Sequence, residues 1–196
     1  MRILLTSIAF SFCVANSFAS DNSISVDAAY IKSLASPDKI VLVIDYRDAT
    51  GKTIERQGFA NSRGFSVTGA TTFAIDENNH INLAAIKPCN GSITVPADDY
   101  RGSCAGYAQE QLAVQLKNPR VIYCVANFAE KNTSEKNATC WGYWFFPGTL
   151  DSVSSIENEL LSVGAVELNE KSNRADFVDA MAIAKKQHVG IFSESK

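Results

Sequence analysis

The spacing of apolar residues along the chain separates segments expected to be helices from segments expected to be strands. Apolar side chains recur every three or four positions in three segments, which begin near Ser103, Ser154 and Ala175. This spacing predicts helices with one buried face. The first helix should end before Pro119, because proline cannot continue the hydrogen-bond ladder, and the last should end at about Gln187. The expected buried faces are Ala105, Ala108, Leu112 and Leu116 in the first helix, and Phe177, Met181 and Ala184 in the last.

The second helix carries sequence signals at both ends. Ser154 and Glu157 have the spacing of a capping box, in which the two side chains bond the first free backbone N–H groups. Gly164 stands where a helix end favours a residue that tolerates positive φ. The pattern therefore predicts a helix that opens at Ser154.

Runs of β-branched and aromatic residues predict strands. In chain order they cover 40–44, 53–59, 64–69, 71–76, 80–86, 120–128 and 138–146. Residues 49–52 read as a turn, so the first two runs should form a hairpin. Residues 88–102 are rich in Pro, Gly, Asn, Asp and Ser, which predicts a loop. Short strands with one helix between them and two behind indicate an α+β fold around a small barrel.

The aromatic run at 141–146 has two faces if it is a strand, because successive side chains point to opposite sides. Trp141, Tyr143 and Phe145 would lie on one face, and Trp144 and Phe146 on the other. One face must belong to the core. The other could be a stacking platform for bases or sugars, which makes Trp141 and Tyr143 candidate binding residues, or it could pack under a helix or the hairpin. We favour packing.

The first residues have the features of a signal peptide. Arg2 precedes an apolar run at 3–14, which is too short to span a bilayer as a helix, and small residues follow at Ser17 and Ala19. We expect cleavage after Ala19 and export to the periplasm or the medium. The remaining chain divides into an N-terminal extension at 20–62 and a main domain at 63–196, without a transmembrane segment.

Four cysteines remain after the leader, which also contains Cys13, is removed. An even number in an exported chain predicts disulfides. We expect Cys124–Cys140, because both residues lie in runs that should be neighbouring strands, and Cys89–Cys104, which would close one loop. A four-cysteine zinc site is the alternative, but its ligands normally occur as close pairs.

The charge balance gives no support to a nucleic-acid-binding role. The chain has 18 Lys and Arg residues against 21 Asp and Glu residues, and cleavage of the leader would remove one of the former, Arg2. Proteins that bind nucleic acids usually show a basic excess or a basic patch. A local patch within this acidic average stays open as an alternative.

The order of segments in the last third resembles the thermonuclease (staphylococcal-nuclease-like) family. The resemblance rests on RVIYCVANF (120–128), ATCWGYWFF (138–146), the helical segments at 154–168 and 175–193, and INLAAIKPC (81–89). It covers about 64–193. It implies a small five-stranded OB-type β-barrel with about three helices. Family members hydrolyse nucleic-acid phosphodiesters with a calcium ion held by two aspartates, a glutamate that activates water and two arginines that stabilise the phosphate.

The positions that match this catalytic site carry other residues. The equivalents are Thr68, Ala70, Asn82, Lys87, Asn90 and Glu135. Ala70 cannot ligate a metal, the ammonium of Lys87 would repel calcium, and Asn90 is not a base. Asn82 stands at the first arginine position and Glu135 near the second, so neither guanidinium is retained.

These departures predict that the usual reaction is lost and that no cofactor is bound. We expect a binding or envelope-associated protein with an unidentified ligand or protein partner, in which Lys87 could hold an anion. One alternative is an active secreted nuclease, acting on DNA or RNA through a rearranged calcium site at Asp76 and Glu77 or at Asp98 and Asp99. Another is a structural partner in a secretion or surface-assembly system. The two histidines, His80 and His188, form no metal or nucleophile pattern.

Overall fold

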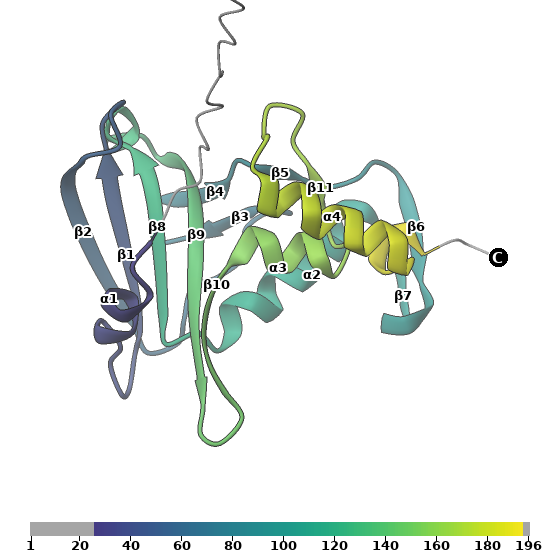
Figure 1. Ribbon diagram of the computed structural model, residues 1–196, viewed down its shortest axis with the longest axis horizontal. Coiled ribbons are helices and arrows are strands. Elements are labelled where there is room, and N and C mark those ends of the chain that lie inside the picture. Colours follow the sequence, from purple (N-terminus) through teal and green to yellow (C-terminus); the bar gives the residue numbers. More distant parts are fainter. Residues whose placement is uncertain (1–25, 194–196) are drawn as a thin grey trace, which may run out of the picture.

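The computed structural model describes residues 26–193, so the predicted signal peptide at 1–19 lies outside the described residues. A mixed sheet of seven strands curls into a half-barrel, and three helices lie on its inner side (Figure 1). The strands follow the order β2-β1-β8-β9-β4-β3, with β10 also paired to β9. Their bounds are β1 Ile40–Arg47, β2 Thr53–Asn61, β3 Thr72–Ala74, β4 His80–Leu83, β8 Val121–Asn127, β9 Glu135–Phe146 and β10 Leu150–Ser155.

The helices and two small sheets complete the fold. The helices are α1 Ala28–Ser33, α2 Cys104–Lys117, α3 Ile156–Ser162 and α4 Ala175–Gln187. The two-stranded sheets are β5 Ile86–Lys87 with β11 Glu167–Leu168, and β6 Ser92–Val95 with β7 Tyr100–Ser103. The class is α+β, as predicted, but the described part of the chain has more strands than the five expected for a small barrel.

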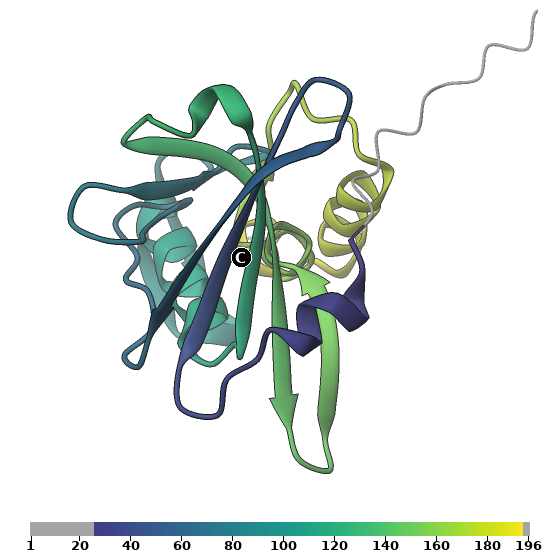
Figure 2. The same cartoon turned by 90° about the vertical axis from the view of Figure 1, so that its left-hand side faces the viewer.

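The predicted N-terminal hairpin is an integral part of the sheet. β1 and β2 pair antiparallel, and β1 also runs parallel to β8 along seven residue pairs. Leu42, Ile44 and Tyr46 have no exposed surface and belong to the main core on the inner side. Val43, on the opposite face, packs with Ile31 of α1 in a second core on the outer side (Figure 2).

The helices follow the predicted spacing, with corrections at single positions. α2 starts after Ser103, whose hydroxyl accepts from Gly106 N at 3.0 Å. Ala108, Leu112 and Leu116 are buried as expected, but Ala105 is exposed. The buried face of α2 begins at Cys104, one position before Ala105, and it includes Tyr107. α4 buries Phe177 and Ala184, and Met181 is half-buried.

Three local predictions were wrong. The strand expected at 64–69 is reduced to an isolated bridge between Val67 and Phe73. The loop expected at 88–102 contains the β6–β7 hairpin, whose strands pair over four residues each. α3 opens one residue later than predicted, with Ser155 as its N-cap. Glu157 is therefore at the second helical position, and its carboxylate is buried instead of capping the helix.

Both predicted disulfides are present. Cys124 and Cys140 lie directly opposite one another on β8 and β9, with 4.1 Å between their Cα atoms. Cys89 and Cys104 connect the segment after β5 to the first residue of α2, with 5.3 Å between their Cα atoms.

Candidate functional site

Asn82 is at the centre of a closed network of polar side chains. It lies on β4, accepts from Thr71 Oγ1 at 3.0 Å and donates to Asn137 Oδ1 at 2.9 Å. Asn137 in turn gives its side-chain amide to Glu130 at 3.2 Å and its backbone N–H to the other oxygen of that carboxylate. These side chains are hydrogen-bond partners for one another, and the network joins β4 to β9.

The other expected catalytic positions do not converge into one pocket. Thr68 lies on the edge segment beside β3, and its backbone N–H bonds Thr72 O at 2.9 Å. Ala70 belongs to the turn that precedes β3 and packs against the core. Asn90 is exposed next to the disulfide of Cys89, and Glu135 is exposed at the start of β9.

Lys87 is on β5, away from the Asn82 network. Its ammonium forms an ion pair with Glu170 at 3.4 Å, in which the side chains of Lys87 and Glu170 are 42% and 89% exposed. An exposed pair of this kind contributes little to stability. The anion-binding role predicted for Lys87 stays a prediction, with Glu170 as a competing partner.

Trp141 and Tyr143 pack in the second core, as the favoured interpretation of the aromatic run expected. Both are at most 9% exposed. Arg174 lies over the Trp141 ring, 5.7 Å from its centroid, and Lys32 lies over the Tyr143 ring at 5.7 Å. Each ring is covered by core packing and by a cation in this arrangement.

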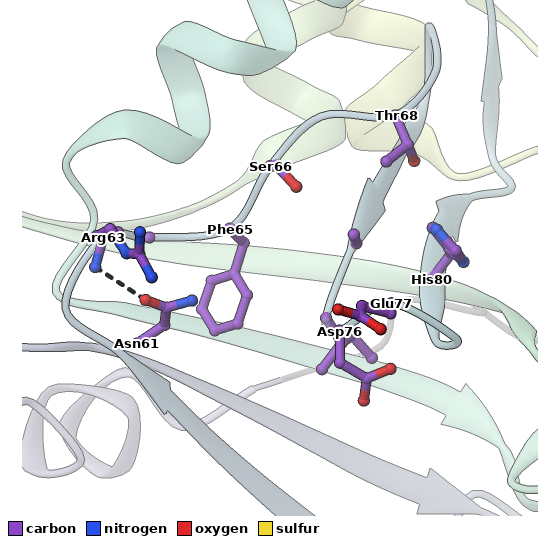
Figure 3. Close-up of a pocket in the computed structure, with 11 residues that line it drawn as sticks. Asn61, Arg63, Phe65, Ser66, Thr68, Asp76, Glu77 and His80 are labelled. Carbon is purple, nitrogen blue, oxygen red and sulfur yellow. Dashed lines mark hydrogen bonds between the residues drawn. The ribbon is translucent and has the colours of Figure 1, made fainter.

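A groove opens where the two edges of the curled sheet face each other (Figure 3). Its volume is about 860 Å³. Asn61 at the end of β2 lies on one side, and Ala74 of β3 and His80 of β4 lie on the other. Phe65 and Ile75, each 8% exposed, contribute its apolar surface. The lining residues all come from positions 61–80, the stretch that runs from the end of β2 to the start of β4.

The acidic side of the groove is a hydrogen-bonded turn between β3 and β4. Asp76 accepts from Asn78 N at 2.8 Å and from Asn79 Nδ2 at 2.9 Å, and these hydrogen bonds lower the pKa of its carboxyl group. Lys136, buried on β9, donates to Asn79 Oδ1 at 3.0 Å, and burial lowers the pKa of its ammonium. Glu77 of the same turn is exposed toward the groove.

The opposite side of the groove carries Arg63. Its backbone N–H bonds Asn61 Oδ1 at 2.9 Å, while Phe65 lies between Arg63 and the acidic turn (Figure 3). Among the described residues, no ion pair involves the guanidinium of Arg63. No pattern in the sequence connects Arg63 with Glu77, because periodicity within a strand does not relate the segment after one strand to the turn after the next.

Among the described residues, neither carboxylate pair proposed for a rearranged calcium site is joined by a third possible ligand. Asp98 accepts from Tyr107 Oη at 2.5 Å, whereas Asp76 is held within its own turn. Within residues 26–193, no three His, Cys, Asp or Glu side chains lie close enough together to form a metal site.

Comparison with known proteins adds no relative. No protein-family model matches the chain, and no curated protein or solved structure matches it either. Between residues 26 and 193, no helix has the length and apolar character needed to cross a membrane. The thermonuclease resemblance therefore stays a prediction based on the sequence.

Proposed function

We propose that the chain is an exported, non-catalytic binding protein with a thermonuclease-like OB-type barrel whose calcium-dependent activity has been lost. The signal-peptide pattern and the two disulfides support export. The loss of activity is supported by the closed Asn82 network, which occupies the place of an arginine. It is also supported by the ion pair of Lys87, which stands at a calcium ligand position.

The groove between the sheet edges is the proposed binding site, and its charge distribution carries this proposal. Arg63 lies at one end, Asp76 and Glu77 lie at the other, and Phe65 is between them. A ligand with an anionic group and a cationic or hydrogen-bond-donating group would match both ends. The volume of the groove, about 860 Å³, is in the range of small-molecule pockets. Zwitterionic peptides of a few residues have this chemistry.

The test is isothermal titration of the chain from residue 20 with zwitterionic di- to tetrapeptides. We expect saturable binding that weakens at least tenfold in Arg63→Glu and in Glu77→Lys. Each variant reverses the charge of one side chain in the groove, which then repels the ligand group expected beside it. Lys52→Glu in the exposed β1–β2 turn is the matched control and should bind as the unmodified chain does. Binding that is equal in all three variants would place the ligand elsewhere.

The nuclease alternative is tested on the same protein with single-stranded DNA and RNA, in the presence of Ca²⁺ and in the presence of a chelator. We expect no cleavage. Calcium-dependent cleavage that persists through purification would overturn the proposal, and its loss in Glu130→Gln would assign it to the carboxylate of the Asn82 network.

A further inference from the structure

The β9–β10 hairpin extends beyond the rest of the molecule (Figures 1 and 2), and apolar side chains lie at its end. Phe145, Phe146 and Leu150 are 39%, 43% and 41% exposed. Pro147 and Gly148 form the turn, in which Gly148 has a φ of +77°. Exposed apolar side chains gathered at one place are typical of a contact surface. We call residues 145–150 the hairpin tip.

The hairpin tip has the properties needed to enter an apolar phase. No charged residue occurs from Ala138 to Leu150. Phe146 pairs with Leu150 across the hairpin, and the turn is closed by Thr149 N bonding Phe146 O at 3.0 Å. The Thr149 hydroxyl bonds the same carbonyl at 3.2 Å. These polar groups have internal partners, which is the condition for placing backbone among lipid chains.

Three cations lie beside the hairpin tip, in a single hollow. Lys39 comes from the α1–β1 connection, and Lys117 and Arg120 come from the end of α2 and the segment before β8. Together with Phe145 and Phe146 they line one hollow, in which Asp38 is the acidic residue. Among the described residues, none of the three cations forms an ion pair. The chain as a whole has a formal charge of −3, so this end reverses the sign of the average.

We propose that the hairpin tip inserts into the interfacial region of an anionic bilayer while Lys39, Lys117 and Arg120 contact the lipid headgroups. Amphipathic surfaces that combine apolar side chains with basic residues bind such membranes. A bilayer fits better than a nucleic-acid strand, because the outermost part of this end is apolar, with aliphatic Leu150 and Pro147, and the cations lie behind it. The inference uses a surface that shares no lining residue with the ligand groove, and it does not depend on that groove.

The test is co-sedimentation of the chain from residue 20 with vesicles of pure phosphatidylcholine or of phosphatidylcholine with phosphatidylglycerol. This chain contains all the described residues and omits the apolar run at 3–14, which would itself bind lipid. We expect binding to the phosphatidylglycerol vesicles that weakens as salt is added, because salt screens exposed charges. Binding to pure phosphatidylcholine should be at least tenfold weaker.

Matched variants assign the binding to this surface. Phe146→Ser with Leu150→Ser should lower the partition coefficient for phosphatidylglycerol vesicles at least tenfold. Lys39→Glu with Lys117→Glu should lower it to the value for phosphatidylcholine. The control is Val178→Ser with Ile183→Ser on α4, where the side chains are 42% and 50% exposed. All these residues are at least partly in solvent, so the variants should keep the fold, which circular dichroism checks.

Three results would overturn the proposal. One is no binding to phosphatidylglycerol vesicles, and another is equal loss in the α4 control. The third is a hairpin tip that binds a second copy of the chain or a nucleic acid but does not bind lipid. Sedimentation velocity would show this as self-association, and titration with single-stranded DNA would show it as nucleic-acid binding, in each case lost in the serine variant.

Discussion

Glu157 places a carboxylate with no exposed surface between β9 and α3. Cys140 N donates to both of its oxygens, at 3.1 and 3.2 Å, and Ser155 Oγ donates at 3.0 Å. On this side of β9, pairing with β4 ends at Ala138 and pairing with β10 begins at Trp141. The N–H of Cys140 lies in the gap between the two partners, and a buried N–H without an acceptor is costly. Glu157 supplies that acceptor.

A second buried carboxylate, Asp45, has the opposite pKa shift. Burial alone would raise its pKa, but hydrogen bonds from Arg56, Tyr123 and Thr53 lower it. Arg56 Nη2 donates to Asp45 Oδ2 at 3.0 Å. For Glu157, burial is the largest cause and raises the pKa to about 7, and the hydrogen bonds and Arg174 only partly oppose it. The difference is a cation in direct contact with Asp45.

The shift of Glu157 predicts that stability falls as the pH rises. The folded chain holds this proton up to a pH of about 7, whereas the unfolded chain releases it near the ordinary value of 4.5. Between these values the folded state binds more protons, so the free energy of unfolding decreases with pH, by about 3 kcal/mol in total. Glu157→Gln should abolish this contribution. Urea unfolding at pH 5 and pH 8, with the disulfides intact, measures it.

Two further variants separate the charge of Glu157 from its role as an acceptor. Glu157→Ala should be less stable than the unmodified chain at pH 5 by about 1–3 kcal/mol, because Cys140 N–H loses its partner. Glu159→Gln, on the same helix but partly exposed, should leave the pH dependence unchanged. If Glu157→Gln showed the same loss between pH 5 and pH 8 as the unmodified chain, another group would be responsible.

At the scale of elements, the sequence predicted best where local signals agree. α2 and α4 combine helical spacing with a clear stop, so their bounds fall within one residue of those expected. The strands at 64–69 and within 88–102 depend on distant partners, which periodicity does not reveal. Ser154 and Ser155 compete for the same capping role. Ser155, the last residue of β10, takes the role, and its hydroxyl accepts from Asn158 N at 3.4 Å.

The two disulfides should differ in their resistance to reduction. Cys124 and Cys140 have no exposed surface between the sheet and the helices, whereas Cys89 is partly exposed in the segment before β6. A thiolate must reach a sulfur atom to exchange with it. We therefore expect mild dithiothreitol under native conditions to open Cys89–Cys104 first.

Alkylation followed by mass spectrometry measures this order. Cys89 and Cys104 should be labelled in the folded protein, and Cys124 and Cys140 only after urea is added. The sequence separations are similar, 15 and 16 residues, so each bond should contribute about 3 kcal/mol in the chain-entropy model. Equal labelling of both pairs in the native protein would contradict the prediction.

At the scale of the whole molecule, the sequence predicted the fold class and both disulfides but not the groove. The equivalents of the family's catalytic residues were found by matching several segments to a family pattern, and in the structure Asn82 and Lys87 are engaged in other contacts. Arg63 follows β2 and Glu77 follows β3, and because these strands are the two edges of a curled sheet, both residues line one groove. Sheet curvature depends on all the strands at once, so spacing within any one segment could not predict it.

The same curvature makes the first strands essential, and we expect a chain that starts at residue 63 not to fold. β1 contributes Leu42, Ile44 and Tyr46 to the main core, and each fully buried apolar side chain is worth about 1.5–3 kcal/mol. Their sum is comparable with the 5–15 kcal/mol that separates a typical folded domain from its unfolded state. Without β1, the parallel edge of β8 would also lose its partner. Circular dichroism and urea unfolding of chains 20–196 and 63–196 test this.

Point variants in the hairpin show whether burial or mere chain length is responsible. Ile44→Ala, at a position with no exposed surface, should cost about 2–5 kcal/mol. Ile54→Ala on β2, where the side chain is 47% exposed, should cost less than about 0.5 kcal/mol. Cooperative unfolding of chain 63–196 would show that residues 40–61 are a separable addition. If that chain stays unfolded and Ile44→Ala is strongly destabilised, the β1–β2 hairpin is an essential part of the main core.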